Sequence, residues 1–450
     1  MRFINCTGNT HQLVDIGKSV PFLGDQEQEI DTDMVKRSAR FRSLVMDFSF
    51  KVTFAEEDRV EQNLWRLQNN QVEFADDGRI KVLFRGHFGG HTGYSKANRN
   101  FLYGMSSVGI DVAISPMSDI NDISSSEKCL LDRFRKIPSD DSILIHSAIP
   151  SFHQKFSHRY NILYTTVEAS TIPVQFIDAC DDYDEIWVAS DFCKDVFLSH
   201  GLRKSIHVVP NSVDNRLYCE NVKPITVKPN LRDFIFISVL SWNYRKGYDI
   251  LLKAYLSAFS RDDNVSLLLV SPYQYDNHGQ RSFLVDAEIK EMIKQYGGSS
   301  PAHISRCGNP IEEHDMPRLY AACDCFVLPS RGEGFGLPYM EASLCGLPII
   351  ATNYSGQRMF LNYDNASLLQ IDRLGKATST GVHFWDGQMF PEMKDSFTQL
   401  GSLMKDVYNN YDVAKMKNSL LQSEISQNYT CNAVGKVTKK HLERIWNSLS

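Results

Sequence analysis

The stretch that most constrains the fold runs from Ala322 to Gln357 and reads ACDCFVLPSRGEGFGLPYMEASLCGLPIIATNYSGQ. It opens with the apolar run from Cys325 to Leu328, which is typical of a strand buried in a parallel sheet. Three glycines punctuate the following loop, and Pro338 suits the first turn of a helix, where its missing N–H costs nothing. Gly346 ends this helix, and an apolar run follows it. The stretch therefore predicts a strand, a loop, a helix and a second strand.

The loop is a candidate anion site because it ends at a helix N-terminus, where free N–H groups and the helix dipole favour negative charge. Two carboxylates, Glu333 and Glu341, flank this point, and their oxygens suit sugar hydroxyl groups. The alternative is a surface loop in which Glu341 merely complements the helix dipole. The complete strand–loop–helix–strand context favours the ligand site, since a motif counts when its surroundings fit.

Glu333 and Glu341, with seven residues between them around Gly-Phe-Gly-Leu-Pro, resemble the signature of the family-4 retaining glycosyltransferases. That family has the GT-B fold, an α/β architecture of two facing Rossmann-like domains with parallel sheets. The resemblance extends over about Ile80 to Ser450. It implies that Glu341 holds the nucleotide ribose and that Glu333 holds the donor sugar. The backbone N–H groups that would hold the donor sugar and phosphate with Glu333 belong to Gly334, Phe335, Gly336 and Leu337.

Length and composition limit the classes of protein. A chain of 450 residues is expected to form two or three domains. The net charge of −6 argues against a nucleic-acid binder, although local basic patches leave a peripheral membrane contact open. No apolar run approaches the roughly 20 residues of a membrane helix, and the first residues lack the apolar core of a signal peptide. Ten cysteines without paired CxxC spacing favour reduced thiols in a cytoplasmic protein.

The pattern along the chain predicts three parts. Residues 1–76 form a small appended module, with short alternating apolar runs that indicate a few strands and a helix from Glu56 to Asn69. Residues 77–222 alternate strand and helix, as in a parallel sheet, and form an N-terminal domain. The resemblance implies that this domain is on the acceptor side and that residues 223–432 form the nucleotide-sugar-binding domain. By the resemblance, the final helix at 433–450 crosses back onto the N-terminal domain.

A glycine-rich loop follows the first predicted strand, from Ile80 to Phe84. Such a loop before a helix suits phosphate approach, but its spacing is not the GxGxxG of dinucleotide-binding proteins. It resembles the Gly-Gly-x-x-Gly-Tyr loop of the family, which lies over the cleft near donor phosphates and acceptor. The resemblance assigns Gly89 and Gly90 to the donor and His91 and Tyr94 to the acceptor side.

Two polar residues stand at the ends of predicted strands, where open α/β sheets bind ligands. His146 ends the run Ser142-Ile143-Leu144-Ile145, and the family often places a histidine there, facing the reacting sugar. The alternative is a structural histidine. Glu168 follows the strand from Ile162 to Val167. The nearby Pro173 to Ile177 resemble a segment of related transferases that precedes an acceptor-side helix, which suggests that Glu168 contacts the acceptor.

Asp182-Tyr183-Asp184 is a formal DxD, a motif that binds metal and nucleotide phosphate in the other large glycosyltransferase fold. Here it precedes the strand Ile186-Trp187-Val188-Ala189, so it stands at the start and not at the ligand-binding end. We interpret it as a solvated turn and expect no metal site.

Lys246 and Arg245 follow the first strand of the second domain, Phe234 to Val239. Lys-Gly at this place resembles the donor-phosphate lysine of the family, so we expect Lys246 to neutralise the leaving diphosphate. The family usually has an arginine about five residues earlier, where this chain has Ser241. Arg245 supplies the second charge if the loop is rearranged.

The sequence thus predicts a metal-independent retaining glycosyltransferase, a hexosyltransferase without a cofactor. It moves a sugar from a UDP- or GDP-sugar to an unknown glycan, lipid or protein acceptor. His146, Lys246 and Glu333 are the predicted catalytic residues. Two alternatives stay open: a catalytically inactive GT-B partner or sensor that binds nucleotide sugar, and another GT-B enzyme such as an epimerase or phosphorylase.

Overall fold

The computed structural model describes residues 78–449, with gaps at 121, 137–140, 151–155, 227–230, 272–283, 378–384 and 394, and five short strands before residue 78. The contacts divide the chain into Met1–Val72 and Glu73–Ser450. In the first unit the strands pair antiparallel in the orders β4-β1-β5 and β2-β3. They are β1 (Arg2–Asn5), β2 (His11–Leu13), β3 (Lys18–Val20), β4 (Gln28–Glu29) and β5 (Phe50–Thr53). The predicted helix from Glu56 to Asn69 lies outside the described residues.

The first Rossmann-like domain has a six-stranded, all-parallel sheet in the order β11-β10-β9-β8-β6-β7. Its strands are β6 (Lys81–Gly86), β7 (Asp111–Pro116), β8 (Ile143–Ser147), β9 (Tyr160–Thr165), β10 (Glu185–Val188) and β11 (Ser205–Val208). The connecting helices are α4 (Gly93–Ser107), α5 (Ser125–Asp132), α6 (Val174–Ala179) and α7 (Asp191–Ser199). The alternation of strand and helix along the sequence is therefore confirmed.

The second Rossmann-like domain has a six-stranded, all-parallel sheet in the order β14-β13-β12-β15-β16-β17. Its strands are β12 (Phe234–Val239), β13 (Val265–Val270), β14 (His303–Cys307), β15 (Cys325–Leu328), β16 (Ile349–Thr352) and β17 (Ser367–Leu369). Its helices are α8 (Tyr248–Ala258), α9 (Leu284–Tyr296), α10 (Met316–Tyr320), α11 (Leu337–Leu344), α12 (Phe397–Asn409) and α13 (Tyr411–Asn428). A hairpin of β18 (Leu374–Lys376) and β19 (Met389–Pro391) follows the sheet.

One predicted boundary is wrong. The apolar pattern from Pro391 to Tyr408 predicts one helix, but Pro391 ends strand β19 and the helix begins at Phe397. A proline contributes no N–H to a ladder or a helix, so the pattern alone does not assign it to one or the other.

Each sheet has a switch point, where strands next to each other in space are not next to each other in the chain. In the first domain it lies between β6 and β8, and in the second between β12 and β15. Ligands of open α/β sheets bind outside the carboxyl ends of the strands at such points. The loops after β12 and β15, which carry Lys246 and Glu333, therefore share one binding position.

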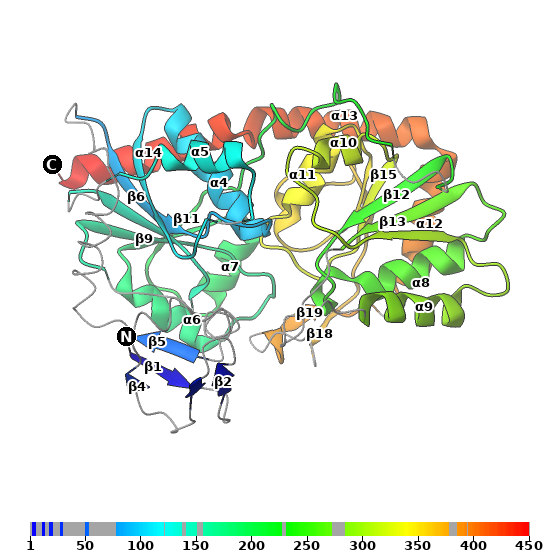
Figure 1. Cartoon of the computed structure of the whole chain (residues 1–450), viewed down its shortest axis with the longest axis horizontal. Coiled ribbons are helices and arrows are strands. Elements are labelled where there is room, and N and C mark those ends of the chain that lie inside the picture. Colours follow the sequence, from blue (N-terminus) through cyan, green and yellow to red (C-terminus); the bar gives the residue numbers. More distant parts are fainter. Residues whose placement is uncertain are drawn as a thin grey trace. The chain divides into compact units, whose positions relative to one another are not determined.

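Helix α14 (Cys431–Leu449) follows the second domain in the chain and packs along α4 (Figure 1). Its buried Val434, Leu442 and Ile445 belong to the same apolar core as the first-domain strands. The two helices approach closely because Gly104 on α4 faces Gly435 on α14, and a Cβ on either would clash with the backbone of the other helix. The first domain is thus completed by the end of the chain.

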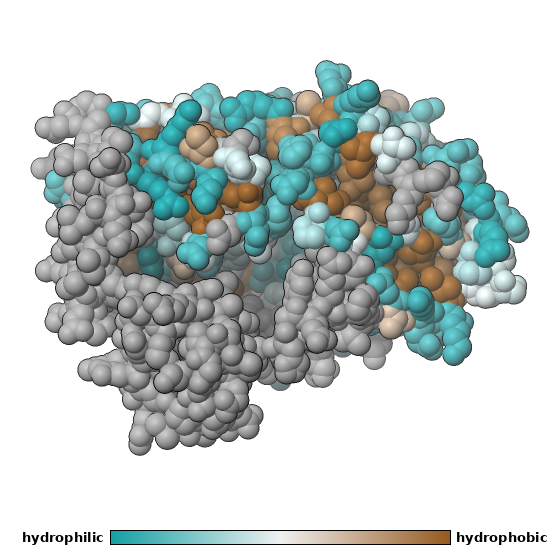
Figure 2. All heavy atoms as spheres, viewed as in Figure 1, coloured by the Kyte–Doolittle hydropathy of each residue, from teal (hydrophilic) through white to brown (hydrophobic). Residues whose placement is uncertain are grey.

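The visible surface is mixed in polarity. Figure 2 shows hydrophobic areas that stay small and are separated by hydrophilic ones among the coloured residues of this face. In the described residues, no helix is both long and apolar enough to cross a bilayer.

Candidate active site

The donor loop, which we define as Pro329 to Gly336, follows β15 and leads into α11 as predicted. Gly336 has a φ of 104°, a conformation that favours glycine, and Pro338 lies in the first turn of the helix. Within the described part of the chain, none of the four N–H groups from Gly334 to Leu337 donates a hydrogen bond to another residue. These groups are therefore available to an anion at the helix N-terminus.

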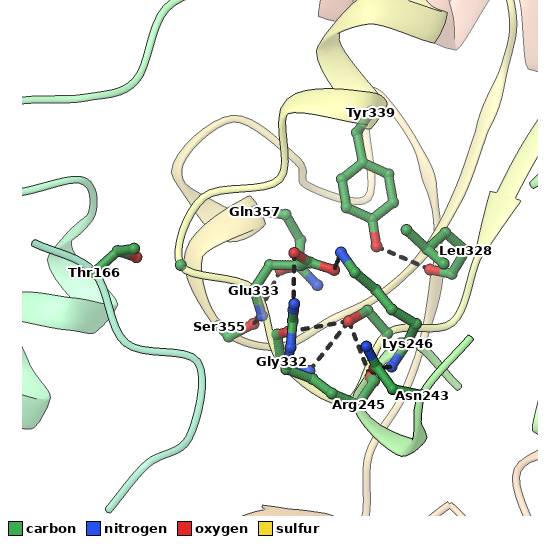
Figure 3. A network of polar contacts seen from close by, with 12 residues as sticks. Thr166, Asn243, Arg245, Lys246, Leu328, Gly332, Glu333, Tyr339, Ser355 and Gln357 are labelled. Atoms are coloured by element: carbon green, nitrogen blue, oxygen red, sulfur yellow. Dashed lines mark hydrogen bonds and ion pairs between the residues drawn. The ribbon is translucent and has the colours of Figure 1, made fainter. Parts of the chain in front are cut away.

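Glu333 lies between two cations at the centre of the site (Figure 3). Its Oε1 is 2.6 Å from the Lys246 ammonium and its Oε2 is 3.1 Å from Nη1 of Arg245. Glu333 is only 6% exposed. Burial alone raises the pKa of this carboxyl, but the charges of Lys246 and Arg245 outweigh it and lower the pKa to about 2. Glu333 is therefore ionised, and Arg245 lies beside the same carboxylate as Lys246.

The turn that carries both cations is fixed by the donor loop. It is a short 3-10 helix, Tyr244–Lys246, capped by the side chain of Asn243. The N–H of Arg331 donates to the Arg245 carbonyl over 2.6 Å, and its guanidinium stacks on Tyr244, with Cζ 4.0 Å from the ring centroid. The same guanidinium makes a bidentate pair with Asp249 at 2.7 and 2.8 Å.

Gly247 completes this fit because it has a φ of 71°, and a Cβ there would clash with the Pro329 carbonyl oxygen. A residue with a side chain would therefore push the 3-10 turn Tyr244–Lys246 away from the donor loop.

Ser355, in the segment after β16, holds the other side of Glu333. Its Oγ accepts a hydrogen bond from the Glu333 N–H over 2.8 Å (Figure 3). The N–H of Gly356 donates to the Glu333 carbonyl over 2.8 Å. Ser355 has φ 66° and ψ −154°, a region that is essentially glycine-only. A non-glycine residue persists there only where its surroundings over-determine it, and here it fixes the backbone of the central carboxylate.

The first domain packs directly on the donor loop. Ser190 donates to the Gly334 carbonyl over 2.8 Å. A Cβ on Gly334 would clash with Thr166, and one on Gly332 would clash with the Glu168 carbonyl. The glycines of the loop therefore let two backbones from different domains meet.

Glu168 and Tyr94, two predicted acceptor-side residues, lie near each other. Burial raises the pKa of Glu168, and the nearby charges of Arg245 and Lys246 oppose that rise. Burial also raises the pKa of Tyr94, and the charge of Glu168 adds to it. Glu168 thus lies in the first domain next to the cation pair of the second.

Glu341 lies in a second cross-domain cluster. Lys96, on α4, places its ammonium 2.7 Å from both Glu341 and Glu313 and donates to the Tyr218 hydroxyl over 2.6 Å. Burial raises the pKa of Glu341, against the opposing charge of Lys96. Tyr320 also donates to Glu341, over 3.4 Å. The predicted ribose ligand is thus held by a lysine from the other domain.

His146 and the first glycine-rich loop belong to the first domain, in β8 and after β6 respectively. His146 is fully buried at the end of β8, and its Nδ1 lies 2.7 Å from the Tyr183 hydroxyl. Gly90 has a φ of 75° with open space where a Cβ would point, Gly89 is half-buried and His91 is exposed. Their roles at the sugar, phosphate and acceptor stay predictions.

The DxD has structural contacts. The carboxylate of Asp184 accepts from the Asn161 N–H over 2.7 Å at the start of β9, and Asp182 belongs to a 3-10 turn before β10. In the described residues, no group of three or more histidine, cysteine or acidic side chains is placed to hold a metal ion.

Several residues of the site have no signal in the sequence analysis. Arg331 and Asp249 are ordinary charged residues in the chain, and Lys96 is one cation on a helix. Ser355-Gly356 is the exception, because a serine–glycine pair after a strand is a turn signal.

Sequence comparison gives a match to the family described as glycosyl transferases group 1 over residues 232–376. The mannosylfructose-phosphate synthase of Agrobacterium fabrum is 25% identical over 225 residues, which are 48% of this chain and 44% of that protein. A GDP-mannose-dependent monoacylated alpha-(1-6)-phosphatidylinositol monomannoside mannosyltransferase of Corynebacterium glutamicum is 29% identical over 119 residues, 25% of this chain and 27% of that one. The chain thus spans less than half the length of either relative.

Structural comparison gives a match to Anabaena HepE, solved in complex with UDP and glucose. The TM-score is 0.58 at 16% identity, over 81% of this chain and 100% of that one. The predicted GT-B fold is therefore confirmed, and the second domain resembles the glycosyl transferases group 1 in sequence.

Proposed function

We propose that this chain is a retaining, metal-independent glycosyltransferase of family 4, which transfers a sugar from a UDP- or GDP-sugar to a glycan, lipid or protein acceptor. The observation that carries the proposal is the pair of buried cations, Lys246 and Arg245, held on Glu333 at the N-terminus of α11. HepE was solved with UDP and glucose, and a relative is named as GDP-mannose-dependent, which supports these two donor classes. The nine described cysteines form no disulfide with one another, which fits a cytoplasmic site of action.

The cations act on the leaving group. As the sugar–phosphate bond breaks, negative charge builds on the phosphate, and fixed positive charges in a water-poor site stabilise it more strongly than they do in water. Arg245 has a donor to spare, because its buried Nε makes no hydrogen bond within the described residues. The N–H groups from Gly334 to Leu337 add the anion site of the helix N-terminus.

Glu333 acts on the sugar. Its ionised carboxylate accepts hydrogen bonds from sugar hydroxyl groups and opposes the positive charge that develops on the ring. The acceptor attacks from the face of the leaving phosphate, which takes the acceptor proton, so retention needs no protein nucleophile. Glu168, beside Lys246 and Arg245, faces the acceptor from the first domain, and Glu341 holds the ribose.

A second candidate is a GT-B protein that binds nucleotide sugar without turnover. It is favoured by the contacts that occupy both glutamates, with Lys96 on Glu341 and the cation pair on Glu333. Slow donor hydrolysis without acceptor separates the two, because a binding-only protein hydrolyses no donor.

The test compares Glu333→Gln with Glu341→Gln. A ribose contact exists in ground state and transition state alike, so Glu341→Gln raises KM and weakens the affinity for free UDP or GDP. The sugar contact changes as the bond breaks, so Glu333→Gln lowers kcat. Loss of a hydrogen bond to a charged group costs about 1.5–3 kcal/mol, or roughly 10- to 150-fold. Free nucleotide has no sugar, so its affinity for the Glu333 variant is unchanged or tighter.

The measurements are nucleotide affinity by calorimetry and turnover with the donor chosen by a thermal-shift screen of UDP-, GDP- and ADP-sugars. The melting temperature without ligand shows that each variant is folded. The same turnover assay in EDTA keeps its rate. Equal nucleotide affinity in the two variants, full turnover in Glu333→Gln, or activity lost in EDTA and restored by manganese would each contradict the proposal.

A further inference from the structure

The hairpin of β18 and β19 belongs to the second domain in sequence but is held by the first domain. The N–H of Ser170 donates to the Met389 carbonyl over 3.1 Å, and the N–H of Met389 donates to Oγ1 of Thr171 over 2.8 Å. The groups are the backbone N–H and carbonyl of Met389 in β19, and the Ser170 N–H and Thr171 hydroxyl in the segment after β9. The hairpin is therefore seated only when the two domains are together.

Trp385, four residues before β19, reaches from this hairpin to the cation pair. It is 7% exposed and forms a small apolar cluster with Ala169 of the first domain and Phe390 of β19. Its ring lies over the guanidinium of Arg245, with 4.8 Å between Cζ and the ring centroid.

The other side of Arg245 is fixed by the donor loop. Its Nη1 donates to the Gly332 carbonyl over 2.6 Å and to the Glu333 carboxylate over 3.1 Å. An arginine side chain has many rotamers and loses more entropy than most on being fixed. Here the guanidinium is confined between a carboxylate and an indole, which together leave it one orientation.

We propose that Trp385 is a positioning residue that holds Arg245 at the leaving diphosphate and does so only when the hairpin is seated on the first domain. This inference rests on the proposed function. A cation–π contact that is shielded from water is stabilised by about 2 kcal/mol or more. When the hairpin packs on the first domain, Trp385 would therefore hold Arg245, the second positive charge at the phosphate, in place as the two domains close. This chain has Ser241 where the family has its usual arginine.

The experiment first removes the indole of Trp385 and then replaces its partner, Arg245. Trp385→Leu is expected to lower kcat about 5- to 30-fold, the rate equivalent of 1–2 kcal/mol. The affinity for free UDP or GDP falls by a similar factor, because the free diphosphate carries the charge that the donor develops only as the bond breaks. The donor KM changes less. Trp385→Phe keeps an aromatic face and stays within about threefold of wild type, and Trp446→Leu, which removes an indole at α14, is unchanged.

A double-mutant cycle of Trp385→Leu with Arg245→Lys tests whether Trp385 acts through Arg245. Lysine at that position keeps the charge but loses the planar stack on the indole. In that background, Trp385→Leu should add less than about a twofold loss in kcat or diphosphate affinity. An equal loss in both backgrounds, or a Trp385→Leu protein with wild-type kcat and diphosphate affinity, overturns the inference. If wild-type protein turns over no donor, the proposed function fails, and the cycle in diphosphate affinity still decides the role of Trp385.

Discussion

Lys96→Met is expected to weaken the joint between the two Rossmann-like domains. The ammonium of Lys96 lies 2.7 Å from Glu313 and 2.7 Å from Glu341, and both carboxylates belong to the second domain while the lysine belongs to the first. The side chains of these three residues are 12%, 16% and 4% exposed. Methionine keeps most of the volume and removes the charge, so the variant leaves two buried carboxylates facing each other.

The magnitude follows from this burial. Removing one partner of a buried ion pair costs about 3–5 kcal/mol, because the remaining charge is neither paired nor hydrated. A unit of the size of Glu73–Ser450 unfolds with an entropy of roughly 0.8 kcal/mol/K, so each kcal/mol shifts the melting temperature by about 1.3 °C, and the expected loss is about 4–6 °C at pH 8. A matched control is Lys294→Met, since Lys294 is 79% exposed and lies 4.0 Å from Glu291. Exposed pairs contribute at most about 1 kcal/mol.

The loss should also depend on pH. Burial and the neighbouring Glu313 raise the pKa of Glu341, and only the charge of Lys96 opposes them strongly. Without Lys96 the pKa rises further, so the folded protein binds a proton that the unfolded chain releases. Stability then falls with rising pH between the unfolded and folded pKa values. The deficit of Lys96→Met should therefore shrink as the pH is lowered from 8 toward 5.

Thermal unfolding of wild type, Lys96→Met and Lys294→Met at pH 8, 6.5 and 5.5 measures both effects. Lys96→Met/Glu341→Gln removes one of the two stranded charges and should regain part of the loss at pH 8. A shift below about 2 °C at pH 8, or a deficit that stays constant down to pH 5.5, would refute the reasoning.

Two further substitutions test the supports of the site and of the domain pair. Arg331→Lys keeps the charge but loses the bidentate contact with Asp249 and the stack on Tyr244; we expect about a 10-fold or greater drop in kcat, measured by steady-state turnover, and unchanged kcat would contradict it. Gly104→Val forces a side chain into the α14 backbone and should cost at least about 1–3 kcal/mol in urea unfolding. Ser106→Val, exposed on the same helix, is its control, and equal stability of the two variants would count against the packing argument.

The sequence predicts the part of the site that depends on the order of strands, loops and helices along the chain. Glycine and proline mark where β15 ends and α11 begins, and the alternation of strand and helix places Lys246 and Glu333 after strands. The parallel sheet then brings them together at the switch point, 2.6 Å apart. Arg245 joins them because a 3-10 turn, which no hydrophobic period signals, directs its side chain to the same carboxylate.

Local sequence patterns do not predict the contacts between the two domains. Lys96 and Glu341 are far apart in the chain, and their pairing depends on how two finished domains pack, which no local period encodes. His146 shows a different limit: the apolar run locates the end of β8, but the environment of a side chain there depends on which face of the sheet it joins. The histidine lies 2.7 Å from the Tyr183 hydroxyl, in the interior.

The return of α14 to the first domain has a consequence for recombination. Val434, Leu442 and Ile445 complete the core of a domain whose other core residues precede the linker, the segment that leads into β12. A gene fusion with one crossover in the linker would set α14 of one parent against α4 of the other, and Gly104 and Gly435 must then fit a foreign backbone. Exchange of the second domain between such proteins therefore needs two crossovers, one in the linker and one between α13 and α14. In chimeras made that way, all residues of each domain's apolar core come from one parent.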